Sequence, residues 1–124
     1  MILQILLSLC PMREIFTFKS YFRDFYERIS DEAKEKIDYA LMLLKTQNRV
    51  SAKFVKFIED GIFELRAEYR SIAYRIFFIF DDGNIVILFN GFQKKTQRTP
   101  RKDIETAKRI KQEYNESKQR HSEL

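Results

Sequence analysis

The sequence predicts one α+β domain with elements in the order β-α-α-β-β-β-α and a mainly antiparallel four-stranded sheet packed on helices. Two observations predict this class. Apolar residues recur at helical spacing between residues 21 and 46 and again after residue 99, whereas three runs between residues 62 and 92 are β-branched and aromatic. A chain of 124 residues suits a single domain, and 12 Phe against 3 Gly favour a packed aromatic core.

The first part of the chain predicts a strand and two helices. Residues 14–19 alternate apolar and polar side chains, as a short strand does. Ser20 is placed to cap a helix whose apolar stripe covers 22–29. Ser30, with two acidic residues directly after it, is expected to cap a second helix over 31–46. These two helices are expected to form a helical hairpin.

The middle of the chain predicts a change from helix to sheet. A short helical turn is expected at 54–58, and Asp60-Gly61 marks a break after it. Three consecutive antiparallel strands then follow at 62–69, 72–80 and 85–92. The last two are separated by Asp-Asp-Gly-Asn, which is a hairpin turn signal and is therefore not assigned to a metal.

The C-terminal part predicts one more helix. Thr99 is expected at its N-cap and Pro100 at its first position, with the apolar stripe ending at Tyr114. We expect three segments: residues 1–11 as an extension outside the fold, 12–115 as the domain, and 116–124 as a polar tail. A short apolar strand or an anchor is the alternative for residues 1–11.

Positive charge is concentrated in one segment. The formal net charge is +5, yet residues 91–112 alone hold eight basic against two acidic side chains. Such a local surplus is typical of a surface that binds a polyanion such as nucleic acid, and a solvated helix face is the alternative.

Few residue types remain for other chemistry. Cys10 and His121 each stand alone in the sequence, which excludes an internal disulfide, a zinc cluster and a histidine-dependent catalytic pair. The composition suggests a reducing, cytoplasmic location, no membrane partner and no cofactor. The apolar start lacks the basic region and cleavage site of a signal peptide.

Charged residues on the predicted strands form the candidate site. Arg75 lies in an otherwise apolar run and needs a partner, and Glu64 and Arg66 share one face of the preceding strand. A structural ion pair of Glu64 with either arginine is the simpler explanation. Strands paired in sequence order bring Lys94 and Lys95 beside Arg75, so we expect one concave face with several cations around one carboxylate.

Such a set can cleave RNA without a metal, because the ribose 2′-OH supplies the nucleophile. The predicted catalytic residues are Glu64, Arg75, Lys94 and Lys95. Glu64 or a lysine with a lowered pKa is the candidate base, Arg75 the phosphate clamp, and Lys94 or Lys95 the acid or a second clamp. The predicted nucleic-acid-binding residues are Arg66, Thr96, Arg98, Arg101, Lys102 and Lys108.

Residues 12–115 resemble the RelE/HigB-type toxins of type II toxin–antitoxin systems, in the phage-derived branch of the RelE/ParE superfamily. The motifs that carry the resemblance are GIFELR at 61–66, AYRIFFIF at 73–80 and ILFNGFQKKTQRTP at 87–100. It implies a microbial RNase-type fold and ribosome-dependent cleavage of mRNA. Arg75 resembles the family's phosphate-stabilising arginine, and Lys94 and Lys95 its basic residues after the last strand.

The resemblance also implies partners. These are mRNA on the ribosome and a HigA-like helix-turn-helix antitoxin that forms a hetero-oligomer with the toxin. The helix over 31–46 or a sheet edge is the expected docking surface for the antitoxin. Two alternatives remain: a ParE-like toxin that inhibits DNA gyrase without hydrolysis, and a non-catalytic nucleic-acid-binding domain.

Overall fold

The computed structural model describes residues 12–94 and 99–122, which form five strands and three helices. In chain order, these elements are β1 (Glu14–Thr17), α2 (Tyr21–Tyr26), α3 (Asp31–Thr46), β2 (Val55–Glu59), β3 (Ile62–Tyr69), β4 (Ile72–Asp81), β5 (Ile85–Lys94) and α4 (Arg101–Ser122). The predicted α+β class is correct. Residues 1–11, for which an extension was expected, lie outside the described part.

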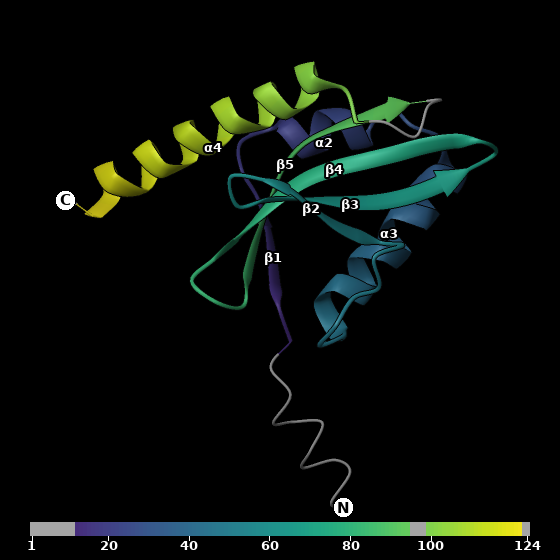
Figure 1. Cartoon of the computed structure of the whole chain (residues 1–124), viewed down its shortest axis with the longest axis horizontal. Helices are drawn as coiled ribbons and strands as arrows, with labels where there is room; N and C mark the ends of the chain where they lie inside the picture. Colours follow the sequence, from purple (N-terminus) through teal and green to yellow (C-terminus); the bar gives the residue numbers. More distant parts are fainter. Residues whose placement is uncertain (1–11, 95–98, 123–124) are drawn as a thin grey trace, which may run out of the picture.

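The sheet has five strands in the order β1-β5-β4-β3-β2, and the expected number of four is wrong (Figure 1). β1 runs parallel to β5, and the other neighbours are antiparallel. The additional strand, β2, replaces the helical turn expected at 54–58. Asp60-Gly61 is the cause: both residues have positive φ, 53° and 72°, which closes a tight β2–β3 hairpin where a break was expected.

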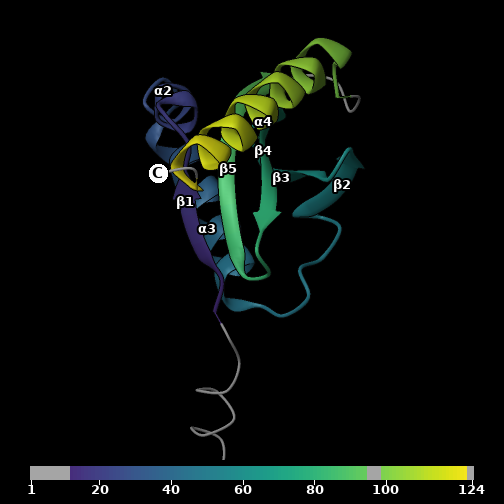
Figure 2. The same ribbon diagram turned by 90° about the vertical axis from the view of Figure 1, so that its left-hand side faces the viewer.

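Helices cover both faces of the sheet. In Figure 2, α4 crosses one face while α3 lies behind the other. Leu65, Ile76 and Phe78 point to the side of α2 and α3, and Ile62 and Phe77 point to the side of α4. Period-two alternation along β3 and β4 therefore divides the interior into two hydrophobic cores.

The buried side of α3 is its apolar stripe. The Ser30 side chain accepts a hydrogen bond from the Ala33 N–H at 3.2 Å, so the expected cap is confirmed. Ile37 and Leu44 on this helix are almost completely buried against the sheet. The stripe is thus part of the core, whereas Tyr39 and Met42 on the same helix are exposed.

The helix α2 begins without the expected cap. The Ser20 hydroxyl donates to the Asp24 carboxylate at 3.0 Å, and among the described residues its side chain makes no capping bond to the helix backbone. The Ser20 and Ser30 hydroxyls thus behave differently, because the Asp24 carboxylate competes with the helix backbone for the Ser20 side chain.

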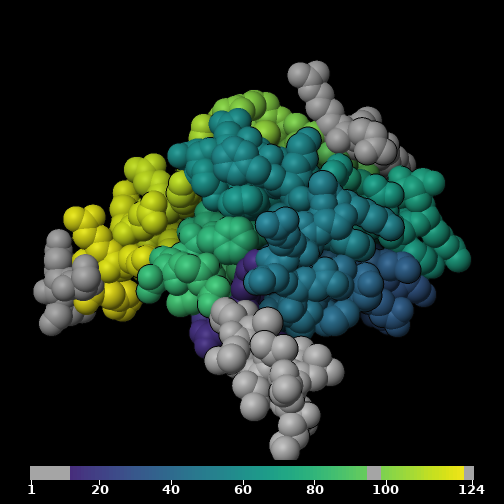
Figure 3. Space-filling model, turned by 60° about the horizontal axis from the view of Figure 1, so that its bottom comes forward, coloured from purple at the N-terminus to yellow at the C-terminus, as the bar shows by residue number. Residues whose placement is uncertain are grey.

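The helix α4 differs from its prediction at both ends. It begins at Arg101, where the Pro100 carbonyl accepts from the N–H groups of Asp103 and Ile104, and it continues to Ser122, well beyond the expected end at Tyr114. Lys118 in this last part forms an ion pair with Asp81 at 2.8 Å. Figure 3 shows the surface of the β4–β5 turn in green beside α4 in yellow.

Within residues 12–94 and 99–122, no helix combines the length and apolar composition needed to cross a bilayer.

Candidate active site

Strand register places four predicted residues on the sheet face that α4 covers. Arg66 pairs with Arg75 across β3 and β4, and Arg75 pairs with Phe92 across β4 and β5. Glu64 and Lys94 lie two positions from Arg66 and Phe92, so alternation points their side chains to the same face. The expected adjacency of Lys94 and Arg75 therefore follows from strands paired in sequence order.

Three of these side chains are buried despite their charge. Glu64 and Arg75 are 0% exposed and Lys94 is 7% exposed. The Arg75 Nε lies 3.4 Å from Glu64 Oε1, and the Arg66 Nε lies 3.6 Å from the same oxygen. The ion pair considered from the sequence is thus present with both arginines, which is how a buried carboxylate is stabilised.

The guanidinium of Arg75 is surrounded by acceptor groups of the protein. Its Nη1 donates to the carbonyls of Ala67 at 3.3 Å and Tyr74 at 3.1 Å, and its Nη2 lies 3.8 Å from a Glu68 carboxylate oxygen. Among the described residues, Arg75 Nε and Nη2 and Arg66 Nε lack a hydrogen-bond acceptor of good geometry. Each of these N–H groups instead lies at ion-pair distance from a carboxylate: both Nε atoms lie near Glu64, and Nη2 lies near Glu68.

Thr99 is a member of this cluster that the sequence did not indicate. Its hydroxyl donates to Glu64 Oε2 at 2.7 Å and accepts from the Lys94 Nζ at 3.3 Å. The side chain expected to cap α4 therefore links the carboxylate to the lysine. Spacing gave no signal for this role, because a threonine before a proline is typical of a helix start.

Burial shifts the acid–base properties of the two buried cations. Burial lowers the pKa of Arg75, and the nearby charge of Arg66 lowers it further, while Glu64 opposes both effects. Burial is also the main cause of a lowered pKa for Lys94, with Glu64 again opposing. A lysine with a lowered pKa exchanges its proton more readily near neutral pH, as a general acid or base must.

Lys56 is a second residue that sequence reasoning missed. It pairs directly with Glu64 across β2 and β3, and its side chain is exposed. Its charge contributes to the lowered pKa of Lys94. No signal pointed to Lys56, because the segment around it was predicted to be helical.

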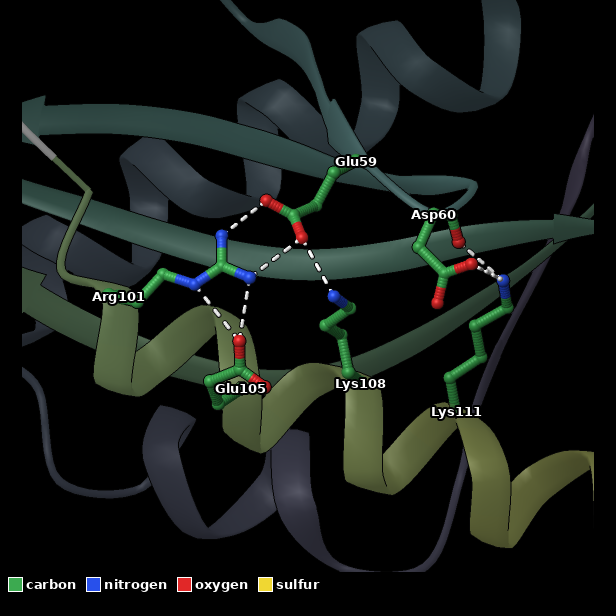
Figure 4. Close-up of polar contacts among 6 residues, drawn as sticks. All are labelled: Glu59, Asp60, Arg101, Glu105, Lys108 and Lys111. Carbon is green, nitrogen blue, oxygen red and sulfur yellow. Dashed lines mark hydrogen bonds and ion pairs between the residues drawn. The ribbon is translucent and has the colours of Figure 1, made fainter.

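Other predicted nucleic-acid-binding residues are occupied within the chain. Arg101 donates from Nη2 to Glu59 at 2.9 Å and also pairs with Glu105, and the Lys108 Nζ bonds Glu59 at 2.8 Å (Figure 4). Lys102 is exposed at the start of α4. Three further predicted residues lie outside the described part of the chain: Lys95, Thr96 and Arg98.

The acidic residues do not gather into a metal site in the described ranges, where no group of three His, Cys, Asp or Glu side chains has a suitable arrangement. Asp81, the last residue of β4 and the first of the predicted turn sequence, accepts hydrogen bonds from Tyr114 and Lys118. Bonding to Lys118 is the main cause of its lowered pKa.

Comparison with known proteins gives one family. The family described as "Phage derived protein Gp49-like (DUF891)" matches residues 24–112, well over half of the chain. Among solved structures, one similar to this chain is a double arginine-to-alanine variant of the E. coli toxin RelE in the free state. Its identity is 12% and its TM-score 0.49, over 64% of this chain and 81% of that chain. No curated protein matches the sequence significantly.

Proposed function

Because this chain belongs to the phage-derived Gp49-like family, a RelE-like toxin family as its sequence suggested, we propose that it is a toxin that cleaves mRNA on the ribosome. The observation that carries this proposal is the convergence of Arg66, Arg75 and Lys94 around the buried Glu64 carboxylate on one face of the sheet. A purely structural ion pair would need only one cation for this carboxylate, whereas three lie around it.

The proposed reaction uses the RNA's own 2′-OH. Its oxygen attacks the adjacent phosphorus and the bond to the 5′-oxygen breaks, which leaves a 2′,3′-cyclic phosphate and a 5′-OH. Arg75 stabilises the charge that develops on the phosphate oxygens. One lysine takes the proton that the 2′-OH loses, and the other gives a proton to the leaving 5′-oxygen. Lys94, the buried amine with the lowered pKa, is one member of this pair and Lys95 the other.

The geometry favours an indirect role for Glu64. Both of its carboxylate oxygens have partners, since Oε1 lies near Arg66 and Arg75 and Oε2 accepts from Thr99. We therefore assign Glu64 to hold Arg66 and Arg75 in place, whereas the sequence made it a candidate base.

The proposed inhibitor is a helix-turn-helix antitoxin. The outer edges of β1 and β2 have no strand neighbour within the described residues, and we propose one of these edges as its docking surface. An added strand would satisfy the free backbone groups there.

Expression of Arg75→Ala and of Lys94→Ala/Lys95→Ala beside the parent tests the proposal. We expect new mRNA ends in translating ribosomes with the parent, and at least about a hundredfold fewer with either variant, the usual loss when a charge-stabilising donor or an acid–base group is removed. The lysine variant keeps the Glu64–Arg75 pair, so it separates lost chemistry from lost folding. Growth arrest in both variants without new mRNA ends would contradict a nuclease and favour a gyrase-directed toxin of the ParE type.

A further inference from the structure

An open groove of about 540 Å³ lies at the edge of the molecule near the site. Its main side chains come from α3, the segment before β2, and β3: Lys36, Tyr39, Lys53, Phe54, Arg66 and Glu68. Two lysines and two aromatic rings beside an arginine make it a mixed cationic and aromatic surface. Nothing in the proposed reaction uses these lysines or rings.

The aromatic part of the groove is preformed and accessible. Tyr39 is 51% exposed, and its ring makes a T-shaped contact with Phe54 at 5.9 Å between centroids. The Lys53 Nζ lies 5.5 Å from the centroid of the Phe54 ring. The tyrosine ring is therefore fixed on one side and open to solvent on the other, with a cation nearby.

Arg66 connects this groove to the buried cluster. The pairing of β2 with β3 begins at Val55 and Leu65, and the N–H of the next residue of β3, Arg66, donates to the carbonyl of Phe54 in the groove at 2.8 Å. The Arg66 Nε is 3.6 Å from Glu64, while its Nη1 donates to the Ala52 carbonyl at 3.5 Å on the groove side. One side chain thus contacts both places.

We propose that the groove binds one nucleotide of single-stranded RNA adjacent to the nucleotide that is cleaved. The base stacks on Tyr39, and Lys36 and Lys53 bind the flanking phosphates. Stacking on aromatic rings with cations along the backbone is how proteins hold single strands without reading their sequence. This inference rests on the proposed function, because it places the neighbouring nucleotide beside that active site.

Binding of a short fluorescent single-stranded RNA, measured by anisotropy, tests the groove apart from catalysis. A second probe has the same sugar-phosphate chain but no bases. We expect Tyr39→Ala to weaken RNA binding about fivefold or more, the usual effect of losing one stacked base, and to leave binding of the abasic probe unchanged. Lys36→Gln/Lys53→Gln should weaken both probes and lower the slope of affinity against salt by about 0.7 per lost phosphate contact.

Matched variants provide the controls. Phe16 is 50% exposed on β1, at the opposite edge of the sheet, so Phe16→Ala removes an equally exposed ring and should bind RNA like the parent. Lys45→Gln/Arg49→Gln removes two exposed cations outside the groove. The inference is overturned if Tyr39→Ala and the parent bind the RNA with equal affinity, which includes no binding by either. It is also overturned if Tyr39→Ala weakens binding of the abasic probe as much as binding of the RNA. Weaker binding of the RNA, but not of the abasic probe, by Tyr39→Ala supports the inference. This support holds even if both nuclease variants remain toxic without new mRNA ends, a result that would refute only the proposed mRNA cleavage.

Discussion

Arg75 is a charged residue in the centre of the sheet, and it is stable there because its neighbours compensate the charge. It shares Glu64 with Arg66, and two backbone carbonyls accept from its Nη1. Removing one member of a buried pair leaves the other charge without compensation, whereas replacing both members avoids that penalty. The same residue that is proposed to bind phosphate is therefore also coupled to the stability of the fold.

We predict that Arg75→Met lowers the free energy of unfolding by about 3–5 kcal/mol. The double variant Arg75→Met/Glu64→Leu should lose clearly less than the sum of its two single variants, because neither charge remains buried alone. Urea denaturation of the four chains measures this coupling.

Lys56→Met is a suitable control for this cycle, because the Lys56 side chain is exposed beside Glu64. It should change stability by at most about 0.5 kcal/mol. Strict additivity of the two buried substitutions would show that Glu64 and Arg75 do not depend on one another.

At the scale of elements, α4 is held by ion pairs and hydrogen bonds to three other parts of the chain. Glu59 bonds Arg101 and Lys108, Asp81 bonds Lys118, and Glu113 on the helix itself accepts from Lys19 and Tyr21. Beneath these contacts, Ile104, Ala107 and Ile110 are buried. Much of the basic charge on this helix therefore serves to position it over the sheet, next to Thr99.

Glu59 makes the docking of α4 sensitive to acid. Hydrogen bonds from Arg101 and Lys108 lower the pKa of Glu59 to about 2 from an ordinary value of 4.5. The ionised Glu59 carboxylate therefore stabilises the fold above pH 4.5, and this contribution is lost as the pH falls toward 2 and the carboxylate is protonated. We predict that Glu59→Gln is less stable than the parent at pH 7, and that the difference shrinks as the pH falls below 4.5.

Urea midpoints at a series of pH values measure the effect. Glu35→Gln, at an exposed position of α3, is the matched control, and it should follow the parent across the series. A constant difference between Glu59→Gln and the parent at every pH would rule out the proposed ion-pair origin.

The elements that sequence reasoning missed share a physical cause. Strong local patterns were predicted correctly, such as Ser30 as a cap and the apolar runs of β4 and β5. β2 was missed because an exposed edge strand has little alternation, and Thr99 because its partners are distant in sequence, with Glu64 as far as 35 residues away. Local spacing predicts which residues can cap or pair, and tertiary contacts decide which of them do.

At the scale of the whole molecule, part of the local surplus of positive charge forms ion pairs within the chain. Residues 91–112 do hold most of the excess, but Arg101, Lys108 and Lys111 in this segment form ion pairs with Glu59 and Asp60. Counting charges along a sequence cannot reveal such pairing. Exposed cations from other segments also lie beside the site: Lys56 pairs with Glu64, and Lys36 and Lys53 line the groove with Arg66.

The last part of α4 provides a test of the domain boundary expected near residue 115. Beyond that position the helix adds an exposed ion pair of Lys118 with Asp81, and an exposed pair contributes at most about 1 kcal/mol. A chain that ends at Asn115 should therefore unfold cooperatively, and its free energy of unfolding should fall by no more than about 1 kcal/mol.

A chain that ends at Glu105 also loses Ala107 and Ile110, both completely buried. It should lose a stable fold, because burial of one side chain such as Ile110 contributes about 1.5–3 kcal/mol. Thermal unfolding followed by circular dichroism distinguishes these chains, and failure of the longer one to fold would extend the domain to Ser122.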